Sequence, residues 1–253
     1  MLAGTPLVAH KADGRLSVFT PPEKCASELY APLTINSPVT RRDLLMVPIL
    51  AGFQQLCETL VRGHGYKRQS SGVINPALAY PDTGKEDYFR TSNPFFAYDL
   101  LQVLDLKIDL SQYTGFEPGG AIGQISATLA LFCDSVHMVE VNPELLALAD
   151  RYYAGLPDAV RRKVNPIQAN LNDEKFRRQT LAELIQRKLL LYDYYWRLGE
   201  GENAPDFRLA RGSLITEVGN YQWQYYPNAR LIGHVAFGRY AAAIWWIGPG
   251  RPF

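Results

Sequence analysis

The residues best suited to chemistry lie around one glycine-rich turn in the middle of the chain. A β-like run ends at Glu117 and enters a turn at residues 118–123, which reads Pro-Gly-Gly-Ala-Ile-Gly. Glycines let the backbone approach a ligand closely and leave amide N–H groups open at the start of a helix. A second β-like run ends at Glu140, where a carboxylate can accept hydrogen bonds from ribose hydroxyls. Together these features predict a site for a nucleoside cofactor.

The segments around the turn have the periodicity that such a site requires. After the turn, apolar residues repeat at helical spacing, at Ile122, Ile125, Leu129 and Phe132. This spacing predicts a helix that covers a sheet. Asn142 can cap a further helix opened by Pro143, and residues 164–169 predict a third short strand. The order of these segments is strand, turn, helix, strand, helix, strand.

The first 90 residues differ from the rest and are expected to form a small α+β extension or cap. Residues 16–19 predict a short strand, whereas 30–39 and 63–91 predict loops. A helix is expected from Pro48 to Arg62, because proline suits a first helical turn and a glycine follows as a stop signal.

The remainder, residues 91–253, is expected to form one domain. Asn93 can cap a helix, and residues 174–198 predict one long helix with a charged side. The β-like runs 213–218, 229–237 and 239–247 are joined by short connections, which favours antiparallel hairpins. The expected fold is α/β: a three-layer sheet that ends in antiparallel strands.

Composition excludes several classes of protein. Of the 253 residues 47% are apolar and 20% are charged, which indicates a globular chain. The net charge of +1 gives no support to a nucleic-acid partner, although a local patch remains possible. No apolar run approaches the ~18 residues that span a bilayer. Three separate cysteines and four scattered histidines predict no metal site and a reducing, cytoplasmic setting.

The motifs and the order of elements resemble the S-adenosylmethionine-dependent methyltransferase family over residues 91–218. In that family the first strand ends in the loop Glu/Asp-x-Gly-x-Gly-x-Gly. Here Glu117, Gly119 and Gly123 match, while Ala121 replaces the middle glycine. The resemblance implies a Rossmann-like fold, S-adenosylmethionine as the cofactor, and a methyl acceptor that the sequence does not identify.

The resemblance also implies a cofactor-binding set: Glu117, Pro118, Gly119, Gly120, Gly123, Glu140, Asn142 and Asn170. The backbone of the turn would contact the methionine portion, and Glu117 would anchor its ammonium indirectly. Glu140 would accept both ribose hydroxyls. Asn142 would lie beside the adenine, and Asn170 would read the adenine amine.

Each of these positions has a structural alternative. A glycine-rich turn can simply join a strand to a helix, Glu140 can be a solvated strand end, and Asn142 can act only as a cap. A nicotinamide-binding domain is the second cofactor hypothesis. Its Gly-x-Gly-x-x-Gly frame, begun at Gly119, requires glycines where Ala121 and Gln124 stand.

The catalytic residues are the least defined part of the prediction. Amino-methyltransferases that act on nucleic acid carry an Asp/Asn/Ser-Pro-Pro-aromatic tetrad after the fourth strand. If residues 214–218 form that strand, Asn220 and Tyr221 follow it as weak candidates for a hydrogen-bond acceptor and a stacking ring. A simple turn is the alternative there. The only Pro-Pro pair, at residues 21–22, is followed by an acid rather than an aromatic residue.

Two functions stay open at this point. One is methyl transfer from S-adenosylmethionine. The other is a catalytically degenerate relative that acts as a binding or assembly subunit. The missing tetrad, the altered glycine motif and a tail expected to be too short for seven strands favour the second. Aromatic residues of the carboxyl-terminal strands, among them Trp245 and Trp246, are candidates for a protein-partner surface.

Overall fold

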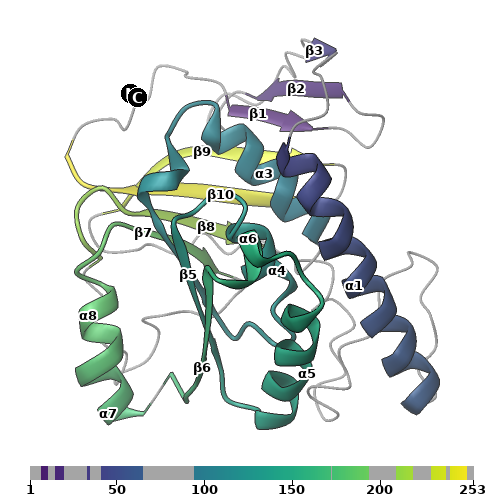
Figure 1. Cartoon of the computed structure of the whole chain (residues 1–253). Helices are drawn as coiled ribbons and strands as arrows, with labels where there is room; N and C mark the ends of the chain where they lie inside the picture. The colour runs from purple at the N-terminus through teal and green to yellow at the C-terminus, as the bar shows by residue number, and fades with distance from the viewer. Residues whose placement is uncertain are drawn as a thin grey trace.

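The computed structural model describes the backbone of residues 7–10, 15–19, 33–34, 41–64, 94–171, 173–193, 209–218, 229–237 and 240–249. The strands of the main sheet are β4 (Thr114–Pro118), β5 (Ser135–Glu140), β6 (Val164–Gln168), β7 (Leu189–Asp193), β8 (Leu214–Val218), β9 (Ala229–Phe237) and β10 (Tyr240–Ile247). They form one seven-stranded sheet in the order β6-β5-β4-β7-β8-β10-β9 (Figure 1). Neighbours from β6 to β8 pair in parallel, and β10 runs antiparallel to β8 and β9. The α/β fold and the antiparallel end of the sheet are therefore confirmed.

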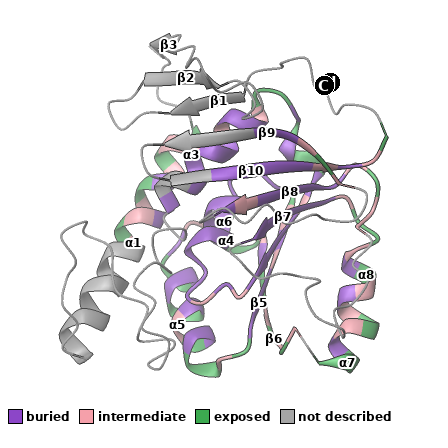
Figure 2. Ribbon diagram, turned by 180° about the vertical axis from the view of Figure 1, so that it is seen from behind, coloured by how far each residue is buried: buried purple, intermediate pink, exposed green. Residues whose placement is uncertain are grey.

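Helices cover both faces of this sheet, which gives three layers. One face carries α1 (Arg41–His64), α3 (Pro94–Asp105), α4 (Gln124–Leu129), α5 (Pro143–Ala154) and α6 (Asp158–Arg161). The other carries α7 (Glu174–Phe176), the π-helical turn η4 (Arg177–Leu181) and α8 (Ala182–Leu184). The short 3₁₀ turn η3 (Leu110–Gln112) leads into β4. In Figure 2 the sheet strands near the centre are buried, while the outer sides of α5, α7 and α8 are exposed.

Alternating residues of the central strands supply two separate cores. Leu190 and Tyr192 of β7 face the α1–α6 side, whereas Leu189 and Leu191 face the α7–α8 side. Every residue of β7 is buried. A strand covered on both faces has this continuous apolar character, unlike a strand with one face in water.

A small antiparallel sheet precedes these elements. Its strands are β1 (Leu7–His10), β2 (Arg15–Phe19) and β3 (Leu33–Thr34), and β1 lies beside β9 (Figure 1). The strand expected at 16–19 is confirmed as β2. The sequence did not predict β1, and β3 falls within a predicted loop. The division of the chain at residue 90 stays a prediction.

The prediction of one long helix at 174–198 is wrong. Helical structure ends at Leu184, and residues 189–193 form β7 between β4 and β8. The reason is that a fully buried strand is apolar at every position, so its periodicity does not distinguish it from a buried helix. Two consequences follow. The sheet has all seven strands, contrary to the expectation of a short tail, and its fourth strand along the chain is β7 rather than β8.

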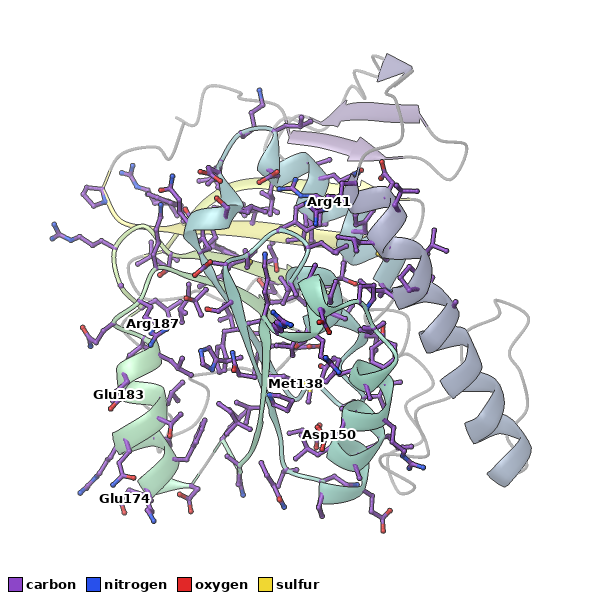
Figure 3. The ribbon with its side chains drawn as sticks, viewed as in Figure 1. Arg41, Met138, Asp150, Glu174, Glu183 and Arg187 are labelled. Atoms are coloured by element: carbon purple, nitrogen blue, oxygen red, sulfur yellow. The ribbon has the colours of Figure 1, made fainter. Side chains whose placement is uncertain are left out.

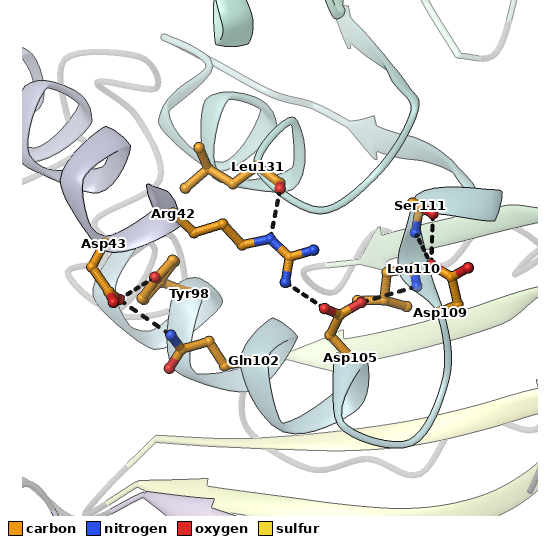
Figure 4. A network of polar contacts seen from close by, with 9 residues as sticks. All are labelled: Arg42, Asp43, Tyr98, Gln102, Asp105, Asp109, Leu110, Ser111 and Leu131. Atoms are coloured by element: carbon orange, nitrogen blue, oxygen red, sulfur yellow. Dashed lines mark hydrogen bonds and ion pairs between the residues drawn. The ribbon is translucent and has the colours of Figure 1, made fainter. Parts of the chain in front are cut away.

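The start of α1 also differs from its predicted position, because the helix begins at Arg41 and includes Pro48 in its interior. The first turn is held by contacts with distant residues (Figure 4). Arg42 forms an ion pair with Asp105 at the end of α3, and Asp43 accepts a hydrogen bond from the hydroxyl of Tyr98. An interior proline removes one backbone hydrogen bond of a helix, and these contacts stabilise the turn that precedes Pro48. No described helix has both the length and the apolar character needed to cross a membrane.

Candidate cofactor site

Two buried carboxylates lie at the carboxyl ends of adjacent parallel strands. Glu117 is in β4 and Glu140 ends β5, and each side chain is 1% exposed. Glu117 is in register with Met138, so both acids project from the same face of the sheet. The glycine-rich turn follows Glu117 directly. Ligands of open α/β sheets bind at this edge, beyond the carboxyl ends of the strands.

Glu140 joins the turn to the start of α5. Its Oε2 atom accepts a hydrogen bond from the Ala121 N–H at 2.9 Å, and its Oε1 atom accepts one from the Asn142 N–H at 2.8 Å. A carboxylate offers about four acceptor positions, so these two bonds leave about two positions for other donors. The turn and the second acid are therefore in direct contact.

The amides of the turn are not open, which differs from the expectation. The N–H groups of Gly119 and Gly120 both donate to the carbonyl of Val139, at 2.8 and 3.0 Å. The Gly123 N–H donates to the Gly120 carbonyl at 2.8 Å. The turn curls back onto the end of β5, because Gly119, Ala121 and Gly123 all have positive φ. A ligand could gain these particular donors only by sharing or replacing the internal bonds.

Ala121 holds an unusual backbone conformation for its residue type. Its φ is 49°, and it is the one non-glycine residue with positive φ in the described part of the chain. A left-handed backbone costs roughly 1–2 kcal/mol for a residue with a Cβ atom. The bond from its N–H to Glu140 stabilises this conformation at the position where the resembling family has a glycine.

Two of the glycines cannot accept a side chain without movement of their neighbours. A Cβ atom on Gly120 would lie 2.1 Å from Cγ of Met138, and one on Gly123 would lie 1.8 Å from the hydroxyl of Tyr153. Met138 projects from β5 toward the α5 side of the sheet (Figure 3). The turn therefore rests on side chains from β5 and α5, and the glycines permit that close approach.

Beneath the turn, hydroxyl groups surround the first acid. Ser126 of α4 donates a hydrogen bond to Oε2 of Glu117. Burial raises the pKa values of Tyr153 and Tyr192 well above the usual value, and the nearby charge of Glu117 raises them further. Both tyrosines therefore keep their protons at neutral pH and remain hydrogen-bond donors in this region.

The two asparagines of the predicted set differ in their surroundings. Asn142 caps α5, as expected, because its side-chain oxygen accepts the Glu144 N–H at 2.9 Å. Asn170 is exposed after β6, and its carbonyl accepts the Asp173 N–H at 2.8 Å. Between Glu140 and Asn142, Val141 is 51% exposed, and the sequence analysis missed it. An apolar residue between a strand-end acid and a helix cap is the signal that could have identified this exposed position.

The sequence analysis also missed Asp193. This residue ends β7 with 1% exposure and is in register with Glu217 of β8. In the sequence it is followed by Tyr-Tyr-Trp. Asn220 and Tyr221 lie outside the described residues, and they follow the fifth strand along the chain rather than the fourth. Recognising 189–193 as a strand would have identified Asp193.

The tryptophans of β10 face opposite sides of the sheet. Trp245 is buried in the core on the α7–α8 side, and its indole N–H donates to Glu217 at 3.1 Å. Trp246 packs against the other core. The remaining aromatic candidates for a partner surface, at 221–226, lie outside the described residues. Among the described residues, no three His, Cys, Asp or Glu side chains converge as metal ligands.

No family model and no curated protein matches this chain. Among solved structures it is similar to the rRNA methyltransferase aviRa from Streptomyces viridochromogenes, with 12% identity, 60% of this chain and 84% of that chain covered, and a TM-score of 0.44. It is also similar to an RNA methyltransferase from Salinibacter ruber in complex with S-adenosyl-L-homocysteine, with 13% identity, coverage of 60% and 93%, and a TM-score of 0.42. A precorrin-6y C5,15-methyltransferase from Geobacter metallireducens has 15% identity, coverage of 59% and 88%, and a TM-score of 0.39. With TM-scores this low, the likeness carries no argument about the activity of this chain.

Proposed function

We propose that this protein binds S-adenosylmethionine at the carboxyl edge of β4 and β5 and transfers its methyl group to an acceptor. One observation carries the proposal: the buried carboxylate of Glu140 holds the Ala121 N–H and the Asn142 N–H and has about two acceptor positions left. Two hydroxyls on adjacent ribose carbons match those remaining positions. S-adenosylmethionine therefore fits the acceptor positions that Glu140 offers.

The other residues have roles that follow from their places around Glu140. The turn at 118–123 would contact the methionine portion, with Glu117 behind it. Val141 offers an exposed apolar surface for the adenine, beside Asn142. Asn170 would read the adenine amine from the end of β6. When bound, S-adenosylmethionine supplies a methyl group on a positively charged sulfur, and the protein contributes mainly by positioning and by excluding water.

Asp193 is the proposed residue on the acceptor side. It ends the strand next to β4, and its register partner is Glu217 rather than a residue of the cofactor set. A buried carboxylate at this place can accept a hydrogen bond or a proton from an acceptor nitrogen or oxygen. Asn220 and Tyr221 remain weaker candidates. The acceptor stays unassigned, and so does a protein partner at the aromatic residues 221–226. A reducing, cytoplasmic setting belongs to the same proposal and rests on the composition of the chain.

A thermal-shift screen with S-adenosylmethionine, S-adenosylhomocysteine and NAD tests the proposal. A ligand at 100 times its Kd stabilises the native state by about 2.7 kcal/mol. For a chain of this size that corresponds to a rise in Tm of roughly 5–10 °C. We expect this rise with the two adenosyl compounds and not with NAD. No shift with either adenosyl compound would contradict the proposal.

A catalytically degenerate binding subunit is the second candidate, and one observation favours it. The amides of Gly119, Gly120, Ala121 and Gly123 all donate within the protein. A turn that satisfies its own donors is stable without a cofactor. If the folded protein binds S-adenosylhomocysteine but methylates nothing in extracts supplied with labelled S-adenosylmethionine, the degenerate function is favoured.

A further inference from the structure

Two neighbouring tyrosines of α5 have hydroxyl groups that hold different parts of the molecule. Tyr152 donates to the carbonyl of Ile49 in α1 at 3.0 Å, and Tyr153 donates to the carbonyl of Gly123 at 3.1 Å. Their side chains are equally inaccessible, at 4% and 5% exposure. Tyr152 therefore attaches α5 to α1, and Tyr153 attaches α5 to the glycine turn. Both use the same type of hydrogen bond.

The Tyr153 hydroxyl also belongs to a chain of polar groups beneath the turn. It lies 3.2 Å from the sulfur of Met138, and the side chain of Ser126 is close enough to affect its pKa. Ser126 in turn donates to Glu117. Because all of these groups are buried, the loss of one member leaves its partners without an easy replacement from water.

The fit at Gly123 shows how closely the hydroxyl approaches the turn. A Cβ atom there would come within 2.5 Å of the ring carbon that carries the hydroxyl and closer still to the oxygen. Gly123 also has a φ of 78°, which favours glycine. The hydroxyl thus supports the last residue of the turn, while Glu140 holds its middle residue, Ala121.

We propose that Tyr153 is a positioning residue of the cofactor site, whose hydroxyl sets the conformation of the turn at 118–123 through the carbonyl of Gly123. The link to a cofactor rests on the proposed function, but the effect on the turn does not. No signal in the sequence distinguishes Tyr153 from Tyr152, because both are aromatic residues near the end of an amphipathic helix. Their separate roles appear only from the two carbonyls that they reach.

The test compares Tyr153→Phe with Tyr152→Phe as the matched control. Each change removes one buried hydroxyl and keeps the ring, so both variants should lose similar stability. Hydrogen exchange followed by mass spectrometry reports on a peptide covering residues 117–125. We expect the exchange of this peptide to be about fivefold faster in Tyr153→Phe and unchanged in Tyr152→Phe, since a lost hydrogen bond of about 1 kcal/mol corresponds to that factor.

Calorimetry with S-adenosylhomocysteine provides the second readout. The affinity should fall about fivefold in Tyr153→Phe and stay at the wild-type value in Tyr152→Phe. Equal changes in the two variants, or a wild-type exchange rate in Tyr153→Phe, would overturn the inference. Faster exchange with unchanged affinity would overturn the role in the cofactor site.

The two proposals fail in distinguishable ways. If the wild-type protein binds no S-adenosylhomocysteine, the proposed function fails, while the exchange of the 117–125 peptide still decides whether Tyr153 holds the turn. If Tyr153→Phe does not fold while Tyr152→Phe does, the expected similar loss of stability is contradicted and the inference is overturned.

Discussion

The two ends of α4 are held by different kinds of contact. At its amino end the glycine turn is fixed by buried groups, with Glu117 and Glu140 each 1% exposed. At its carboxyl end Arg42 contacts the carbonyl of Leu131 at 3.1 Å and lies 4.5 Å from the centre of the Phe132 ring. The Arg42 side chain is 38% exposed, so water and salt reach this end.

This difference indicates where changes should affect function as well as stability. An exposed ion pair contributes about 0–1 kcal/mol and is screened by salt. A buried donor that loses its acceptor costs about 1–3 kcal/mol, because no water replaces the partner. A helix as short as α4 is marginal alone, so both ends need tertiary contacts. We expect variants at the amino end to alter ligand affinity and stability, and variants at the carboxyl end to alter stability alone.

Gly123→Ala should give the largest loss of stability. The new Cβ atom would lie 1.8 Å from the Tyr153 hydroxyl, and the backbone φ of 78° is unfavourable for alanine. Overpacking and backbone strain together should cost about 3 kcal/mol. Urea unfolding measures the loss. Gly155→Ala is the matched control, because Gly155 has a φ of −85° and ordinary space around it. Equal stabilities of the two variants would contradict the predicted fit.

Glu140→Gln should affect stability and ligand affinity together. A glutamine amide accepts hydrogen bonds at one atom only, so either the Ala121 N–H or the Asn142 N–H loses its acceptor. We expect a loss of about 2 kcal/mol in unfolding free energy and at least about tenfold in affinity for S-adenosylhomocysteine. Glu144 is exposed in the same region, and Glu144→Gln should change neither the unfolding free energy nor the affinity by much. Unchanged affinity in Glu140→Gln would remove Glu140 from the site.

Arg42→Ala should destabilise the protein without a change in ligand affinity. It removes the ion pair with Asp105, the bond to the Leu131 carbonyl and the contact with the Phe132 ring. The loss of these three contacts should lower the unfolding free energy by about 1.5 kcal/mol at low salt and by less at high salt. Arg161→Ala breaks a pair with the exposed Asp158 and should cost less. An altered affinity for S-adenosylhomocysteine in Arg42→Ala would abolish the contrast between the two ends.

Ala121→Gly should have the smallest effect, and it should stabilise the protein where the other variants destabilise it. Glycine adopts the observed positive φ without steric strain but loses more freedom on folding, so the net gain should be about 0.5 kcal/mol. Thermal unfolding of the variant measures it. A clear destabilisation would show that the alanine methyl group makes packing contacts that outweigh the relief of strain.

Local signals in the sequence predicted part of the structure around the glycine turn. Asn142 and Pro143 mark the start of α5 because a cap and its first turn are adjacent in the chain. The proximity of Glu140 to the turn follows from the parallel pairing of β4 and β5, which places consecutive strand ends at one edge.

Contacts between distant residues explain what the sequence did not predict. The closed amides of Gly119 and Gly120 depend on where the Val139 carbonyl lies in the folded chain. The first turn of α1 contains Arg42, whose partner Asp105 lies 63 residues away in the chain. β7 was mistaken for helix because its burial on both faces removes any alternation. Asp193 was missed for the same reason.

The most direct measurement is a crystal structure of the protein grown with saturating S-adenosylhomocysteine. The expected result is a ribose whose two hydroxyls lie within hydrogen-bonding distance of the Glu140 carboxylate, with the amino-acid portion of the ligand against the turn at 118–123. A ligand bound elsewhere, or no ligand at a concentration that shifts Tm, would contradict the proposed site.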